Sequence, residues 1–428
     1  ESECSDFAEL QESDWEFIKI SDDGSNANAD QIELSVLGEN LCILYRAEGG
    51  RPKFGQFDFD TKLWSTESVA NKSIASDGVT LLRWNGLNTA IFTVNMVPAS
   101  VDSDSNITVP PINEIRIYQQ TAPETWIYIT DDGLRGWVES PKAAILPNGN
   151  LGLAYKHGIN INGYPSHELN WSEFNGVGWS HSIILSGSNG HVPDITVTLN
   201  EDIFVASMKQ NDSGEVNAVV LGQNDDDEWE IVKTLEENVQ FSQNIRIVSI
   251  GDELIAAYVG SHQNEPSLKV WSSTDSWTLT IVATDIHGRI DMSVVNNRPG
   301  VVFGLNNTLR YRERINNEWF AVDLVASDDI AQRGKTLTEY LQRPFISGLD
   351  MPLRVYAQNI TGKVTSSRPN NVFICECSSN IFPNAMQHIS QVGRWICSGQ
   401  GYADTRVTDT TGDTLRPVIR TRSTDGAV

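Results

Sequence analysis

The sequence predicts an all-β fold, a seven-bladed β-propeller of four-stranded antiparallel blades. The first observation is that a tryptophan repeatedly opens an expected outer strand, just after a turn-like segment such as NGVG or DDDE. The second is that neighbouring tryptophans in this series are 42 to 62 residues apart up to Trp319, a period typical of propeller repeats. The third is that Asn- and Gly-rich turns separate short apolar strands, as tight hairpins require. The series is Trp15, Trp64, Trp126, Trp179, Trp229, Trp277, Trp319 and Trp395.

The clearest repeat covers residues 143–185. It begins with an apolar strand, turns at Pro147–Asn150 and returns as Leu151–Tyr155. A third strand follows, then a turn at Asn175–Gly176 and a last strand that Trp179 opens. Four strands in about 45 residues match the length of one propeller blade.

The repeat divides the whole chain, 1–428, into a single propeller domain. The strand at 15–20 is expected to pair with the last blade and close the ring, which removes the open edge of the sheet. The expected blades are 28–72, 73–137, 138–187, 188–238, 239–286, 287–328 and 340–400.

The charge balance excludes some partners. With 31 basic and 56 acidic residues the formal net charge is −25, so the basic footprint that nucleic acid requires is absent. No apolar run reaches the roughly 18 residues of a membrane span. The chain starts at Glu1 without an initiator Met or a signal peptide, and we expect a processed, secreted, monomeric protein.

Basic and proton-transferring residues occur where a four-stranded blade would present them at one mouth of the propeller. The second strand of a blade ends at the face where the first strand begins, so these positions converge. They predict an electropositive cleft for an anionic substrate, although strand ends that simply meet solvent are the alternative. The residues at second-strand ends are Arg46, Lys156, His157, Lys209, Tyr258, His262 and Tyr356. Those at first-strand starts are His191, Arg246, Arg289 and Arg343.

These residue types suit β-elimination on a uronic acid. His157 and Tyr258 can exchange protons, and Arg246 can neutralise a carboxylate. A glycosidase would instead need two carboxylates beside the bond, and at the mouth only Glu168 and Asp194 come near this requirement. The expected substrate-binding residues are Lys156, Tyr164, His191, Lys209, His262 and Arg289.

A second kind of site is predicted near the C-terminus. Cys375, Cys377, His388 and Cys397 provide three thiolates and one imidazole, which form a closed tetrahedral shell for a structural zinc ion. A disulfide with one spare thiol is the alternative. Cys42 either pairs with Cys4, which we favour, or is a small apolar strand residue.

The segment LAYKHG at 153–158, followed by Gly163, Trp179 and HVPD at 191–194, resembles the neuraminidase-like repeat of secreted β-propeller polysaccharide lyases, the seven-bladed ulvan lyases of marine bacteria. The Cys/His set also resembles that group. The resemblance implies an endolytic lyase that cuts a sulfated rhamnose–uronate polymer, with His and Tyr handling protons and Arg neutralising the acid. Only His157 carries a matching motif.

Two other functions remain open. DDGLRGW at 131–137 resembles a degenerate Asp-box, which would suit a sialidase-like hydrolase. A carbohydrate-binding lectin is the other alternative. A lectin should repeat its binding residues from blade to blade, whereas Arg46, His157 and Lys209 differ at comparable places, and this asymmetry favours one central site.

Overall fold

The computed structural model describes strand β1 (Trp15–Lys19), residues 32–322 with short gaps, and five strands between 345 and 397. Side chains are described within residues 33–319, again with gaps. A helix with the length and apolar character of a membrane span was not found in this part of the chain.

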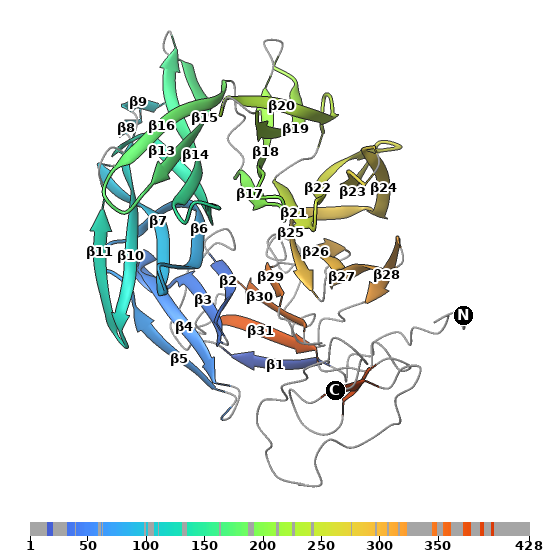
Figure 1. Cartoon of the computed structure of the whole chain (residues 1–428), viewed down its shortest axis with the longest axis horizontal. Helices are drawn as coiled ribbons and strands as arrows, with labels where there is room; N and C mark the ends of the chain where they lie inside the picture. Colours follow the sequence, from blue (N-terminus) through green and yellow to red (C-terminus); the bar gives the residue numbers. More distant parts are fainter. Residues whose placement is uncertain are drawn as a thin grey trace.

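Six four-stranded antiparallel sheets form blades 1 to 6, arranged around a common centre (Figure 1). Blade 1 comprises β2 (Ile32–Leu37), β3 (Asn40–Arg46), β4 (Pro52–Asp58) and β5 (Leu63–Ser68), with a 3-10 turn at Glu48–Gly50. Blade 2 comprises β6 (Ile74–Trp84), β7 (Leu87–Val97), β10 (Ile112–Ala122) and β11 (Thr125–Thr130). Its long insertion holds the small ladder of β8 (Ser100–Val101) and β9 (Ile107–Val109), and β12 (Arg135–Gly136) pairs with β10.

The next four blades are each made of four consecutive strands. Blade 3 has β13 (Val138–Ile145), β14 (Leu151–Ile161), β15 (Tyr164–Phe174) and β16 (Trp179–Ser186). Blade 4 has β17 (Asp194–Val197), β18 (Ile203–Gln210), β19 (Val216–Gln223) and β20 (Trp229–Glu236). Blade 5 has β21 (Ile245–Ile250), β22 (Glu253–His262), β23 (Glu265–Ser272) and β24 (Thr278–Thr284). Blade 6 has β25 (Ile286–Val295), β26 (Arg298–Leu305), β27 (Thr308–Ile315) and β28 (Glu318–Val322).

A further four-stranded sheet has the order β1-β31-β30-β29. Its strands are β29 (Phe345–Gly348), β30 (Arg354–Ile360), β31 (Asn371–Cys377) and β1, and β1 pairs antiparallel with β31. Strand β29 contacts β25 of blade 6 and β2 of blade 1. Strands β32 (Met386–His388) and β33 (Trp395–Cys397) form a separate two-stranded ladder.

The first strand of each blade contacts the first strand of the next, from β2 through β6, β13, β17 and β21 to β25. These inner strands surround the centre of the ring. The structure therefore confirms an all-β propeller of four-stranded antiparallel blades, and side chains on its inner strands share one central space.

The repeated tryptophans pack between blades. In blades 2 to 6 each one lies against the hydrophobic cluster that its blade shares with the preceding blade, so the sequence period marks the junctions. Burying such large rings contributes strongly to stability, which explains why tryptophan recurs at this position. The residues are Trp126, Trp179, Trp229, Trp277 and Trp319.

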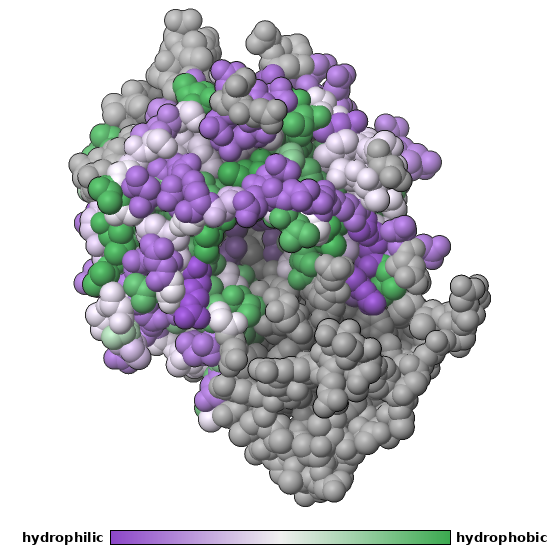
Figure 2. All heavy atoms as spheres, viewed as in Figure 1, coloured by the Kyte–Doolittle hydropathy of each residue, from purple (hydrophilic) through white to green (hydrophobic). Residues whose placement is uncertain are grey.

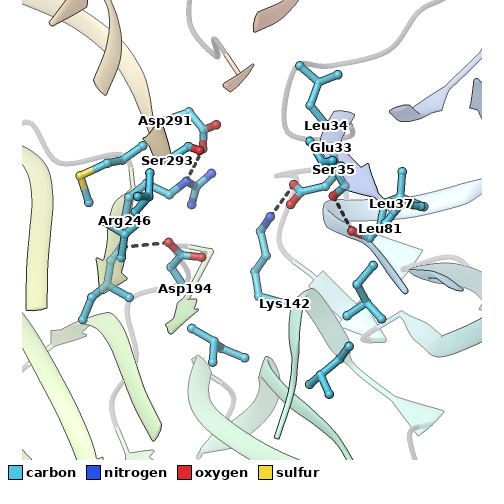
Figure 3. A pocket seen from close by; sticks show the side chains of 18 of the residues that line it. Glu33, Leu34, Ser35, Leu37, Leu81, Lys142, Asp194, Arg246, Asp291 and Ser293 are labelled. Carbon is cyan, nitrogen blue, oxygen red and sulfur yellow. Dashed lines mark hydrogen bonds and ion pairs between the residues drawn. The ribbon is translucent and has the colours of Figure 1, made fainter. Parts of the chain in front are cut away.

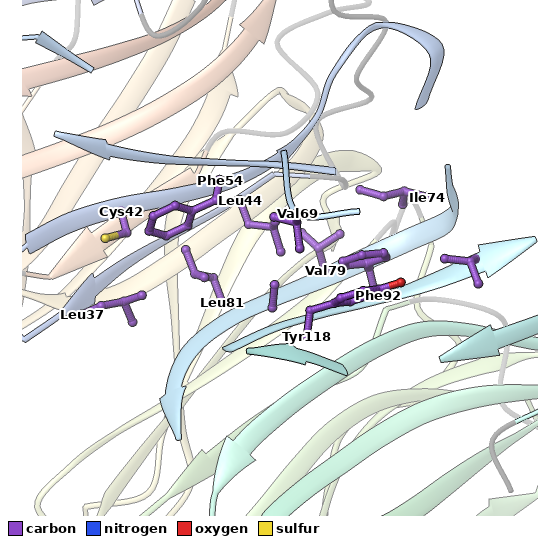
Figure 4. Close-up of a cluster of buried hydrophobic side chains, with 12 residues drawn as sticks. Leu37, Cys42, Leu44, Phe54, Val69, Ile74, Val79, Leu81, Phe92 and Tyr118 are labelled. Carbon is purple, nitrogen blue, oxygen red and sulfur yellow. The ribbon is translucent and has the colours of Figure 1, made fainter. Parts of the chain in front are cut away.

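The junction between blades 1 and 2 is drawn in Figure 4, where side chains of both blades interdigitate. Cys42 is fully buried in this cluster, and its thiol is free. Burial raises the pKa of that thiol to about 12. The favoured Cys4–Cys42 disulfide is therefore wrong, and Cys42 acts as a small apolar strand residue.

Candidate functional site

A cavity of about 550 Å³ lies at the centre of the propeller, lined by the inner strands of all six blades. The outer surface is hollowed near its centre in the view of Figure 2. Six ionisable side chains line the cavity, three acidic and three basic, so their formal charges balance. They are Glu33, Arg83, Lys142, Asp194, Arg246 and Asp291.

The buried charges in this central cavity are paired across blades (Figure 3). Lys142 Nζ of blade 3 lies 2.6 Å from Glu33 Oε2 of blade 1. Arg246 Nε of blade 5 lies 2.8 Å from Asp291 Oδ1 of blade 6. Asp194 Oδ2 accepts a hydrogen bond of 2.9 Å from the backbone N–H of Ile247. Such pairing is what makes buried charges tolerable in a protein interior.

Two of these carboxyl groups are harder to ionise than usual. Burial raises the pKa of Glu33, although the neighbouring Lys142 ammonium acts in the opposite direction. Burial likewise raises the pKa of Asp194, against the opposing effect of Arg246. Both carboxyls therefore hold a proton at higher pH than a solvated carboxyl, which suits a group that donates protons.

A second group lies on blade 3 and is called the rim group: Trp137, Glu139, Lys156, His157 and His167. Lys156 Nζ lies 3.2 Å from Glu139 Oε2, and Trp137 Nε1 donates a 2.9 Å hydrogen bond to Glu139 Oε1. The His167 ring meets the edge of the Trp137 ring at a centroid distance of 5.0 Å.

Glycine at position 158 makes this packing possible. A Cβ at Gly158 would lie 2.1 Å from the Trp137 ring, closer than any real contact. The backbone N–H of Gly158 donates a 2.7 Å hydrogen bond to the carbonyl of Trp137, which fixes the approach. The glycine of the LAYKHG segment thus allows the indole of Trp137 to lie beside His167.

His167 is the residue of the rim group with the most perturbed environment. Burial lowers its pKa, and the nearby Lys156 ammonium lowers it further, while Glu139 acts in the opposite direction. His167 is therefore a neutral imidazole at neutral pH, able to accept a proton. His167 was not singled out from the sequence. The available signal was the β14–β15 hairpin, which pairs Gly158 with His167 and so puts His167 on the face of Lys156, while His157 pairs with Glu168 and points from the other face.

The rim group and the central cavity share strand β13. Glu139 of the rim group and Lys142 of the cavity are three residues apart on this strand, with a register shift between them.

The predicted site residues with described side chains do not lie in one place. Arg246 lies in the central cavity, and Lys156 and His157 lie in the rim group. Lys209 and His262 lie half-buried near the ends of the second strands of blades 4 and 5, as their sequence positions indicate.

Tyr258 does not face the mouth, and that prediction was wrong. Its side chain is fully buried between blades 4 and 5. Its hydroxyl donates a 2.7 Å hydrogen bond to Glu236 Oε2 and accepts one of 3.1 Å from Trp271 Nε1. Burial and the Glu236 carboxylate raise its pKa far above the usual tyrosine value. Strand alternation turns this side chain into the blade junction, which the position near a strand end did not indicate.

The acidic residues were also misjudged. No compelling carboxylate was predicted at the mouth, whereas Glu33, Asp194 and Asp291 all line the central cavity. Asp194 had been considered and set aside. Glu33 and Asp291 are brought in by the meeting of distant inner strands.

The other predicted residues lie where side chains are not described. Tyr164 belongs to β15 and Arg289 to β25, while His191 falls outside the described residues. The expected zinc ligands belong to three strands whose side chains are likewise outside the described part. Cys375 and Cys377 lie in β31, His388 in β32 and Cys397 in β33.

No known protein family matches the sequence, and no curated protein is similar to it. Among solved structures, the chain is similar to a PL25 ulvan lyase bound to -[GlcA(1-4)Rha3S]-, with a TM-score of 0.54 and 10% identity over 83% of this chain and 95% of that one. A second PL25 ulvan lyase structure gives the same values. The polysaccharide lyase Uly1 follows with a TM-score of 0.49 and 9% identity over 81% and 89% of the two chains. At this identity the first two likenesses show a shared propeller fold.

Proposed function

We propose that this protein is a polysaccharide lyase that cleaves an acidic, uronate-containing polysaccharide, ulvan being the first candidate, by β-elimination. The observation that carries the proposal is that His167 packs against Trp137 with Lys156 and His157 nearby, on the blade whose first strand β13 also lines the central cavity. The propeller fold shared with two ulvan lyase structures agrees with it.

The reaction needs three groups. A base takes the proton from C5 of the uronate, the C4–O4 bond breaks as the C4=C5 double bond forms, and an acid protonates the departing O4. We assign the base to His167 and the acid to His157, whose charge is close enough to lower the pKa of His167 although the two side chains leave opposite faces of the β14–β15 hairpin. These histidines replace the buried Tyr258 in proton transfer, and each such transfer typically contributes 10²–10⁴-fold.

A cation must offset the uronate carboxylate so that the C5 hydrogen becomes acidic. Arg246 suits this role because its Nε binds Asp291 and its Nη1 donates to the carbonyl of Ile245. Its Nη2 has no recorded partner among the described residues and can turn to a ligand. Lys156, close to His167, provides a second positive charge.

The test is near-ultraviolet absorbance during incubation with a panel of acidic polysaccharides that includes ulvan. A rise in absorbance reports the conjugated double bond of an unsaturated uronate, and the polymer that responds identifies the substrate. The same assay with the His167→Ala variant serves as the control. A flat trace with every polymer contradicts the proposal.

A glycoside hydrolase is the second candidate, and the central cavity favours it. Glu33, Asp194 and Asp291 converge there, and the first two hold their protons more tightly than usual. Glycosidases use a carboxyl group with a raised pKa as general acid beside a second carboxyl group. New reducing ends without a rise in absorbance would support this candidate. Retention on one polymer without cleavage would support a lectin.

We also propose that the sheet β1-β31-β30-β29 is a seventh blade. Its strand β29 contacts both β25 and β2, and β1 supplies its outer strand from the other end of the chain. In this arrangement the N-terminal strand closes the ring and leaves no open sheet edge. Deleting residues 1–20 should then lower the melting temperature of the whole propeller. An unchanged melting temperature would contradict the closure.

The structural zinc site remains a proposal that rests on donor chemistry. Three thiolates and one imidazole suit zinc and leave no position for substrate: Cys375, Cys377, His388 and Cys397. Metal analysis should find one zinc ion per chain, and chelation should lower the melting temperature before turnover falls. A metal-free preparation with parental stability would exclude the site.

A further inference from the structure

A second cavity, of about 310 Å³, lies between blades 1 and 2, and we call it the flank pocket. It is lined by β4 and β5 of blade 1 and by the end of β10 with its hairpin in blade 2. Its lining combines carboxamides, hydroxyls, carboxylates and apolar groups. The lining residues that carry the argument are Phe54, Gln56, Ser65, Glu67, Gln120 and Glu124.

Glu67 is fixed in this pocket by neutral donors alone. Its Oε1 accepts hydrogen bonds from Gln120 Nε2 at 2.6 Å and from Trp126 Nε1 at 2.5 Å. Its Oε2 accepts one of 2.6 Å from the backbone N–H of Glu124. Gln120 is held in turn, since its Oε1 accepts a 2.8 Å hydrogen bond from Asn88. The carboxylate is thus rigidly oriented, and no cation among the described residues is recorded as its partner.

The junction between blades 4 and 5 has a carboxylate at the equivalent position, but there side chains of the next blade bind it. Glu236 corresponds to Glu67, because each pairs with the third residue of its neighbouring strand, Ala218 or Phe54. Glu236 binds Lys269 Nζ at 2.7 Å and the hydroxyl of Tyr258 at 2.7 Å. The charge of Glu236 is therefore neutralised by Lys269, whereas Glu67 lines an open pocket without a recorded cation among the described residues.

The open pocket also presents hydrogen-bonding capacity that is not used elsewhere. Within the described residues, the Gln56 carboxamide has no recorded hydrogen bond, and the Ser65 hydroxyl on the same face donates a 3.3 Å bond to the carbonyl of Gln56. A carboxamide offers two donors and an acceptor, and the Ser65 oxygen can still accept. The ring of Phe54, at 5.2 Å from that of Trp126, forms an apolar part of the wall.

We propose that the flank pocket binds one neutral sugar unit, separately from the central cavity. Its volume is at the lower end of small-ligand sites and fits a single monosaccharide. Sugar hydroxyls match the mixed donors and acceptors of Gln56 and Ser65, and the sugar's C–H face matches the apolar wall. Uronate or sulfate groups are excluded, because Glu67 and Glu124 would repel them.

The test is ligand-observed NMR and calorimetric titration of the full chain with neutral monosaccharides, including L-rhamnose, L-fucose, D-galactose, D-xylose and D-glucose, and with D-glucuronate as the charged counterpart. Ser65→Trp fills the pocket, because Ser65 pairs with Gln56 and shares the face of Glu67. Thr66→Trp is the matched control, since Thr66 is also exposed but points from the opposite face of β5. At least one neutral sugar should bind, at least tenfold more weakly in Ser65→Trp and unchanged in Thr66→Trp.

The proposal is overturned if no neutral sugar in the panel binds, if both Trp variants behave alike, or if D-glucuronate or calcium ions bind there instead. His167→Ala should keep parental affinity for the neutral sugar while it loses turnover. Because Ser65→Trp should keep turnover, failure of the flank pocket and failure of the lyase assignment give different results. Melting curves confirm that each variant is folded.

Discussion

The central cavity and the rim group differ in how their charges are arranged. In the cavity, Lys142 pairs with Glu33 and Arg246 pairs with Asp291, each pair joining two blades. In the rim group, His157 and His167 come from one hairpin of blade 3, and both rings are only half-buried. The cavity ties the blades together with paired charges, whereas the rim group keeps titratable rings close to solvent.

This difference separates positioning from proton transfer. A buried ion pair resists any change of protonation because each charge depends on its partner. A half-buried histidine with a lowered pKa can gain and lose a proton near neutral pH. We therefore expect changes in the rim group to affect turnover and changes in the cavity to affect stability as well.

The largest expected effect is on turnover, through the rim group. His167→Ala removes the base and should lower the lyase rate by about 10²–10⁴-fold without unfolding the chain. The measurement is the initial rate of absorbance increase. His181→Ala, which changes an exposed histidine on the same blade, is the control and should retain the parental rate. Parental activity of His167→Ala would remove this histidine from the mechanism.

The next effect is on stability, through the cavity. Arg246→Met leaves Asp291 buried without its cation and should cost about 3–5 kcal/mol in the free energy of unfolding. Denaturant unfolding measures this cost. The double variant Arg246→Met/Asp291→Asn should recover part of the lost stability, because it leaves no unpaired charge buried. If Arg246→Met were as stable as the parent, the Arg246–Asp291 pair would not contribute to holding the blades together.

A smaller effect is expected at Tyr258. Tyr258→Phe removes the hydroxyl that links Glu236 and Trp271, which should cost about 1–3 kcal/mol of stability. Turnover should stay at the parental level, since this ring is buried away from both the cavity and the rim group. Denaturant unfolding and initial rates, measured on one preparation, test these two expectations. A large loss of rate at parental stability would indicate that Tyr258 takes part in catalysis.

The smallest effect is a displacement of the pH profile. The folded pKa of His167 is below the usual histidine value of about 6.5, so the neutral base persists as the pH falls through that value. The acid limb of kcat/KM should therefore lie below pH 6.5.

The unfolded chain binds the proton more readily, so His167 contributes stability above about pH 6.5 that is lost as the pH falls through its folded pKa. An acid limb above pH 6.5 would contradict the assignment.

Much of the fold could be predicted because its signals are local. Turn residues, apolar strands and the tryptophan period lie within single blades, and the tryptophans do pack at the blade junctions. Two residues of the rim group, Lys156 and His157, could be predicted for the same reason, because they lie at the end of a second strand. His167, only ten residues away, was missed because its importance depends on burial against Trp137, which no local pattern shows.

The sequence by itself determined the blades, their turns and the chemistry present at the tip of blade 3. Only the tertiary structure decided which charges meet in the central cavity, since Lys142 and Glu33 are 109 residues apart and Arg246 and Asp291 are 45 apart. Register shifts in β13, before Lys142, and in β25, before Asp291, also interrupt the regular pairing of these strands. A β-bulge changes which face a side chain takes, so alternation along the sequence cannot foretell it. The same holds for the open and closed junctions at Glu67 and Glu236, whose difference depends on what the next blade places against each carboxylate.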